Sequence, residues 1–113
     1  MDNSNNVPDS IKNAVKNNDR SMIRIMLCDP LLLDPTSKTF NVYLKYVLKN
    51  IPDFYDRNEP DNSLSKDPKE WTKDYMNHLM VLTKMKFTQE RVNLLKKVVR
   101  VVLSDKIIKI ERT

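Results

Sequence analysis

Hydrophobic residues recur three or four positions apart in five segments of the chain, which is the spacing of one buried helical face. No segment alternates hydrophobic and polar residues for long enough to compete as a β-strand. We therefore expect an all-α fold, a compact bundle of about five helices joined by short links. The expected helices cover about residues 8–17, 20–28, 37–50, 67–84 and 88–104.

Prolines and helix-capping residues set several of these boundaries. Pro30 ends the second helix, because the residue before a proline is pushed out of the helical region. Asp67, followed by Pro68 in the first turn, predicts the start of the fourth helix, and Thr88 is expected to cap the fifth. The predicted core stripe of the fourth helix consists of Trp71, Tyr75, Leu79 and Leu82.

The remaining segments lack helical periodicity. Residues 31–35 form an apolar connector that we expect to pack onto the core. Residues 52–66, called the acidic loop below, are the long stretch where function or flexibility is expected. We expect a disordered N-terminus (1–7), a single helical domain (8–104) and a basic tail (105–113), which is either a helix extension or an extended arm.

Composition narrows the class of protein. A chain of 113 residues can bury one core but not two. Its N-terminus is polar and acidic and its apolar runs are short, so we expect neither a secretory signal nor a transmembrane helix, and hence a cytoplasmic location. The sequence contains no glycine, which excludes Gly-rich phosphate loops, the EF-hand turn and the nucleophile elbow.

Few residues are suited to catalysis or metal binding. Cys28 is the only cysteine and His78 the only histidine, so neither a thiolate zinc cluster nor a two-histidine metal site can be assembled from this chain. A small buried side chain is the expected role of Cys28, and a structural position on a helix flank that of His78. We therefore expect a protein that is not an enzyme and uses no cofactor and no metal.

Charge is distributed unevenly around a net value of +5. Residues 51–70 hold six acids and three bases, and the carboxylates of Asp53, Asp56, Glu59 and Asp61 are of the type that binds calcium. Their spacing is not that of an EF-hand, so solvated loop charge is the favoured interpretation.

Residues 71–113 have the opposite balance, with ten bases and four acids. Lys96, Lys97 and Arg100 are expected on one face of the fifth helix, away from its hydrophobic stripe. Such a cluster can contact phosphate backbones, and it can equally attract an acidic protein or keep a helix surface solvated.

Two resemblances carry structural expectations. Residues 13–19, followed by Met22, Ile23, Met26 and Leu27, resemble the helical hairpin of ankyrin-type repeats, with Asn18 in place of the glycine usual in the turn. This resemblance implies an antiparallel pair of helices. The whole chain is similar to small helical proteins of low-GC Gram-positive bacteria, some of them immunity partners of secreted toxins, which implies binding to another protein. The residues behind this similarity are 10–14, Phe40, 44–47, Trp71, 74–75, 90–92 and 96–98.

The function we expect is non-catalytic protein binding, of an immunity or regulatory type. Asp53, Phe54, Tyr55 and Asp56 are the candidate contact residues, because aromatic residues are enriched in binding hot spots. The alternative for Phe54 and Tyr55 is that they fasten the loop to the core. A nucleic-acid-associated protein that uses Lys96, Lys97 and Arg100 is the competing function.

Self-association is a further expectation, drawn from the fifth helix. Hydrophobic residues cover more of its surface than one buried stripe requires, so part of that surface could meet a second copy. The residues beyond the stripe that could form the seam are Val92, Leu94, Val98 and Val101.

Overall fold

The computed structural model describes residues 6–62 and 64–112, and the all-α class is confirmed for them. They contain seven α-helices, of which α3 is a single turn, so the helices outnumber the five expected. The helices are α1 (Asp9–Lys16), α2 (Arg20–Cys28), α3 (Pro30–Leu33), α4 (Lys38–Asn50), α5 (Lys73–Met85), α6 (Gln89–Val102) and α7 (Ser104–Glu111), with a short 3-10 helix at Pro68–Glu70.

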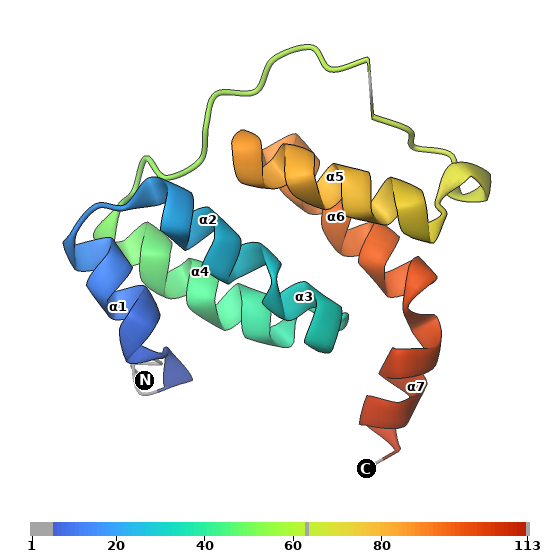
Figure 1. Cartoon of the computed structure of the whole chain (residues 1–113), viewed down its shortest axis with the longest axis horizontal. Coiled ribbons are helices and arrows are strands. Elements are labelled where there is room, and N and C mark those ends of the chain that lie inside the picture. The colour runs from blue at the N-terminus through green and yellow to red at the C-terminus, as the bar shows by residue number, and fades with distance from the viewer. Residues whose placement is uncertain (1–5, 63, 113) are drawn as a thin grey trace.

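The helices form two neighbouring groups (Figure 1). Helices α1 to α4 pack together on one side, and α5 and α6 form an antiparallel pair on the other, from which α7 extends. The acidic loop arches over one end of the molecule and carries the chain from α4 to the second group. The molecule is flattened, with extents of 40 × 40 × 20 Å.

The turn between α1 and α2 is tight although it lacks glycine. Asn18 adopts φ 51°, the left-handed region that asparagine tolerates better than most residues. The amides of Asn18 and Asp19 donate to the carbonyls of Val15 (3.0 Å) and Ala14 (2.9 Å), which closes the end of α1. Asp19 then accepts a hydrogen bond from the Met22 amide and caps α2.

The segment expected as an apolar connector is partly helical. Pro30 begins α3, since a proline is well placed in the first turn of a helix, and Leu31 is buried as expected. The Ser37 side chain makes no capping bond to α4, and the Thr36 hydroxyl accepts the Lys38 amide at a long 3.4 Å. Ser37 instead has φ 70°, and the Asp34 carboxylate accepts the amides of Thr36 (3.2 Å) and Thr39 (3.1 Å).

The predicted start of the fourth helix is wrong by five residues. Asp67 does act as a cap, but of the 3-10 helix at Pro68–Glu70. Trp71 and Thr72 then leave the helical region, and the Thr72 hydroxyl accepts the Tyr75 amide (3.1 Å) to cap α5. Trp71 therefore lies outside the helix, half-buried, with its indole N–H donating to the Ser65 carbonyl (2.9 Å).

The C-terminal segment from Ser104 is helical. The helical backbone is interrupted at Leu103, the residue after α6, and α7 begins at the next residue. Ile107 is buried, and the Lys106 ammonium donates to the Leu32 carbonyl at the end of α3 (2.7 Å). Ser104–Glu111 are thus a helix that packs through Ile107, and not the extended arm that the sequence left open.

The centre of the core is the ring of Phe87, in the link between α5 and α6. Its centroid lies 6.5 Å from that of Phe40, 5.2 Å from that of Phe54 and 5.4 Å from that of Tyr55. These distances are typical of favourable aromatic pairs. Helix α4, the acidic loop and the link between α5 and α6 therefore meet at a single side chain.

Most of the hydrophobic residues of α6 that exceed one buried stripe pack into this core. Val92, Leu94 and Val98 are buried within the chain, and of the four residues proposed as a self-association seam Val101 alone is exposed. No helix among the described residues is long and apolar enough to cross a membrane.

Candidate functional site

The acidic loop enters the core at its first turn. Phe54 is completely buried, so its ring cannot meet a partner in this conformation. Tyr55 stacks on Phe87 with an interplanar angle of 20°, and burial raises the pKa of its hydroxyl. For these two aromatics the structure supports the alternative that they fasten the loop to the core. Phe54 is not available as an exposed hot spot, whereas Tyr55 keeps part of its surface exposed.

Asp56 connects the acidic loop to both helix groups. One carboxylate oxygen accepts the Phe87 amide (2.7 Å) and a guanidinium N–H of Arg24 in α2 (2.9 Å). The Asp56 amide in turn donates to the Phe87 carbonyl (2.8 Å). Arg24 also donates to the Met85 carbonyl (3.0 Å), at the C-terminal end of α5 where carbonyls lack helical partners. Asp56 therefore has a structural role that already occupies its carboxylate.

The other acids in the loop are paired as well, although the side chains of Asp53 and Glu59 stay largely exposed. Each of the four carboxylates considered as calcium ligands pairs with its own base. The nitrogen–oxygen distances are 3.1 Å for Asp53 with Arg20, 2.9 Å for Asp56 with Arg24, 2.7 Å for Glu59 with Lys86 and 3.0 Å for Asp61 with Arg91.

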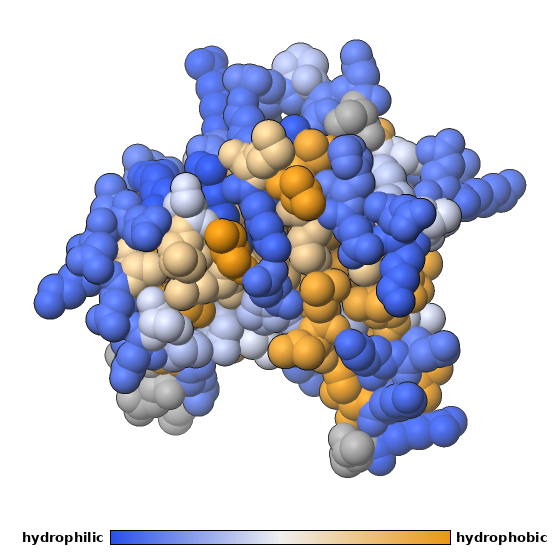
Figure 2. All heavy atoms as spheres, in the orientation of Figure 1, coloured by the Kyte–Doolittle hydropathy of each residue, from blue (hydrophilic) through white to orange (hydrophobic). Residues whose placement is uncertain are grey.

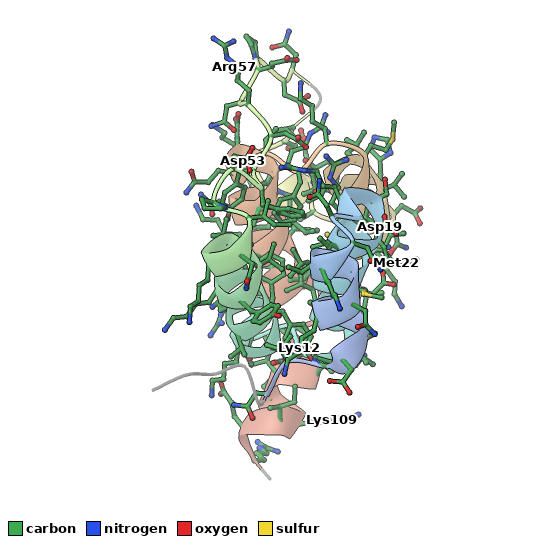
Figure 3. The ribbon with its side chains drawn as sticks, turned by 90° about the vertical axis from the view of Figure 1, so that its left-hand side faces the viewer. Lys12, Asp19, Met22, Asp53, Arg57 and Lys109 are labelled. Atoms are coloured by element: carbon green, nitrogen blue, oxygen red, sulfur yellow. The ribbon has the colours of Figure 1, made fainter. Side chains whose placement is uncertain are left out.

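These ion pairs alter how the excess of acids in residues 51–70 is interpreted. The loop carboxylates face guanidinium and ammonium groups and do not converge on one another, and no cluster of three or more potential metal ligands occurs in residues 6–62 and 64–112. Figure 3 shows the loop projecting beyond the helices, with Arg57 pointing away from the body and Asp53 closer to α4.

The three bases of the nucleic-acid alternative have different surroundings. The Lys96 ammonium donates to Asn41 of α4 (2.9 Å) and lies 5.6 Å from the centroid of the Phe40 ring. Lys97 lines a different region, a cavity of about 300 Å³ beside Trp71 and Leu94. Arg100 is exposed. The structure therefore separates Lys96 from Lys97.

The two residues considered for chemistry lie in unlike surroundings. Cys28 is fully buried, and desolvation raises the pKa of its thiol to about 12, which keeps it protonated and unreactive at neutral pH. His78 is exposed on α5. The position of Cys28 matches the role expected of a small core residue, and His78 lies on a solvent-exposed flank of α5.

Sequence reasoning missed the exposed hydrophobic residues on two neighbouring helices. Helix α2 exposes Met22 (41%) and Ile25 (39%), and α5 exposes Val81 (54%) and Met85 (69%). We call these four residues the α2/α5 face. Figure 2 shows hydrophobic side chains over both helices on one side of the molecule, with hydrophilic ones between them. An ion pair of Lys84 with Asp29 also joins the two helices.

A signal for this surface was present in the sequence of α2. Hydrophobic residues lie around most of that helix, more than one core-facing stripe can hold. Such a pattern is typical of a central, buried helix, whereas only Ile23, Leu27 and Cys28 of α2 are buried.

Comparison with known proteins gives no relationship for this chain. No family model matches the sequence, and no curated protein and no solved structure shows significant similarity to it.

Proposed function

We propose that this protein is a non-catalytic helical domain that binds another protein through the α2/α5 face. The observation that supports this proposal is the exposure of two large hydrophobic side chains on each of two adjoining helices. Met22 and Ile25 are three positions apart and Val81 and Met85 four apart, so each pair lies on one side of its helix.

The composition of the face suits protein recognition. Methionine is unbranched and polarisable, and it adapts its shape to a partner better than branched residues do. Hydrophobic residues surrounded by charged ones are the usual arrangement of a transient interface, with an apolar centre and a polar rim. Here the rim includes Lys84 and Asp29, which are paired with each other.

The face replaces the acidic loop as the proposed contact surface. Phe54 is buried, and Asp53 and Asp56 are engaged by Arg20 and Arg24. An immunity or regulatory role remains the form of this proposal that we favour, since either would require a surface for a protein partner and no chemistry.

The test combines crosslinking with measured affinity. A photo-reactive residue at position 85 should crosslink to one partner in cells that express the protein, whereas the same residue at Val101, also exposed at 50%, should not. The purified partner should then bind Met85→Asp at least about tenfold more weakly than it binds the unmodified protein, because burying an unpaired charge is costly.

The matched control is Val101→Asp, which adds the same charge at an exposed hydrophobic position outside the face. Equal crosslinking from positions 85 and 101, or unchanged affinity of Met85→Asp, would refute the assignment of this face.

A further inference from the structure

The two parts of the acidic loop are held to the helices by different kinds of contact. Its first part is anchored by the buried Phe54 ring and by the main-chain and side-chain bonds between Asp56 and Phe87. The following part, residues 57–62, has neither regular structure nor a fully buried side chain. We call residues 57–62 the outer segment.

The described contacts of the outer segment with the helices are polar. Glu59 pairs with Lys86, Asp61 pairs with Arg91, and the Asn58 side chain accepts the Glu90 amide at 3.4 Å. Beneath it lies a cavity of about 120 Å³ lined by Glu59, Pro60, Asp61, Lys86, Thr88 and Arg91. The outer segment thus bridges over a polar space, so its release removes ion pairs and hydrogen bonds without opening the hydrophobic core.

One of the two bases beneath the outer segment is held independently of it. Arg91 donates to the carbonyls of Leu82 (2.7 Å) and Lys86 (3.3 Å), which holds its guanidinium at the end of α5, and its Nε–H is the group that meets Asp61. Lys86 is the residue directly after α5, and its ammonium pairs with Glu59. The Arg91 guanidinium is therefore a preformed positive group whether or not the outer segment covers it, and Lys86 lines the same cavity.

We propose that the outer segment is an autoinhibitory contact, and that Lys86 and Arg91 bind an acidic polypeptide segment of a partner when the outer segment is released. In the structure the outer segment itself occupies this site, and its carboxylates pair with Lys86 and Arg91. Glu59 and Asp61 are two positions apart, and side chains at this spacing point to the same side of an extended chain. The ligand is thus a peptide with carboxylates at alternate positions.

This proposal goes beyond binding at the α2/α5 face, because it concerns another surface and a regulated one. The two can fail separately. The test uses a labelled poly-glutamate peptide as the probe and measures its affinity by fluorescence anisotropy at low salt, where attraction between charges is least screened.

The release variant is Glu59→Gln with Asp61→Asn, and its control is Asp105→Asn with Glu111→Gln, which makes the same change in net charge at exposed positions of α7. The release variant should bind the probe about fivefold more tightly than the control variant, since two competing ion pairs are removed. Adding Lys86→Gln to the release variant should abolish this gain, and adding Lys109→Gln should not.

Equal affinity of the release and control variants would overturn the proposal, as would a gain that survives Lys86→Gln. A gain seen with a single-stranded oligonucleotide but not with poly-glutamate would overturn it in favour of nucleic acid. If the double substitution unfolds the protein, Glu59→Gln alone carries the same test. Trypsin cleavage after Arg57 provides a second readout and should be faster in the release variant than in the control, with the circular dichroism spectrum unchanged.

Discussion

Replacing Phe54 by alanine tests whether the acidic loop is part of the core. The Phe54 ring is completely buried, contacts Phe87 edge to face at 5.2 Å, and has the Arg20 guanidinium 5.8 Å from its centroid. Removing a buried phenylalanine costs about 3 to 5 kcal/mol, and the aromatic pair adds about 1 kcal/mol to simple burial. We therefore expect Phe54→Ala to lower the free energy of unfolding by about 4 kcal/mol.

Urea unfolding followed by far-UV circular dichroism measures this change. A loss of this size in a chain of this length also corresponds to a decrease in melting temperature of roughly 15 °C. Tyr55→Ala serves as the comparison, because Tyr55 is only half-buried and should cost clearly less. A loss below about 1 kcal/mol for Phe54→Ala would refute the reasoning and return Phe54 to the candidate contact residues.

Substitutions at three further positions test local features of the fold. Trp71→Ala should cost about 1 to 2 kcal/mol by urea unfolding, less than a fully buried tryptophan, since Trp71 is half-buried outside α5; a loss above about 3 kcal/mol would contradict this placement. Asn18→Ala should cost about 1 kcal/mol and Asn18→Gly close to nothing in the same assay, because φ is 51° there; equal effects would contradict the left-handed turn. For Asp34, burial raises the pKa, but hydrogen bonds from Thr36 and Thr39 outweigh it and hold the pKa below its usual value. Asp34 therefore stabilises the fold above its unfolded-state pKa of about 3.9, and this contribution is lost as the pH falls through the lower folded-state pKa. The free energy of unfolding, measured as a function of pH, should show this acid-side decrease in the unmodified protein. Asp34→Asn should lack it.

Helices with a clear hydrophobic period and a local capping residue were predictable from the sequence. The bounds of α2 agree with the prediction, and Asp19 caps one end as a local residue. At the other end the predicted reason is wrong, because Asp29 stays in the helical region (φ −57°, ψ −40°); Pro30 lacks the N–H that would continue the hydrogen bonds of α2, and it begins α3. Thr88 likewise caps α6 as expected, through a bond from the Arg91 amide. In both cases residues within a few positions of the helix end determine where it lies.

The predicted helix starts were wrong where more than one nearby residue can cap the helix. Asp67, Pro68 and Glu70 form a valid helix start, but Thr72 offers a second cap five residues later, and the chain uses both, with Trp71 turned aside to bond Ser65. Similarly, Asp34 reaches past Thr36 and Ser37 to cap α4 from outside the positions where a cap is usually sought.

The candidate site was less predictable than the fold, because it depends on contacts between distant residues. The acids of the loop could be counted, but their partners lie about 30 residues away in α2, at the end of α5 and in α6. A count of charges does not show that each acid faces a base. Nor does the pattern of α2 show which of its hydrophobic residues remain uncovered.

The long sequence separation of these ion pairs has a kinetic consequence. Closing a chain segment of about 30 residues costs conformational entropy, and the free energy of an ion pair at the surface is too small to offset that cost. The pairs should therefore form late, after α2 and α5 have docked around Phe87. Interactions absent from the transition state act on the unfolding rate alone. Added salt, which weakens such pairs, should accelerate unfolding of this protein while leaving its folding rate nearly unchanged.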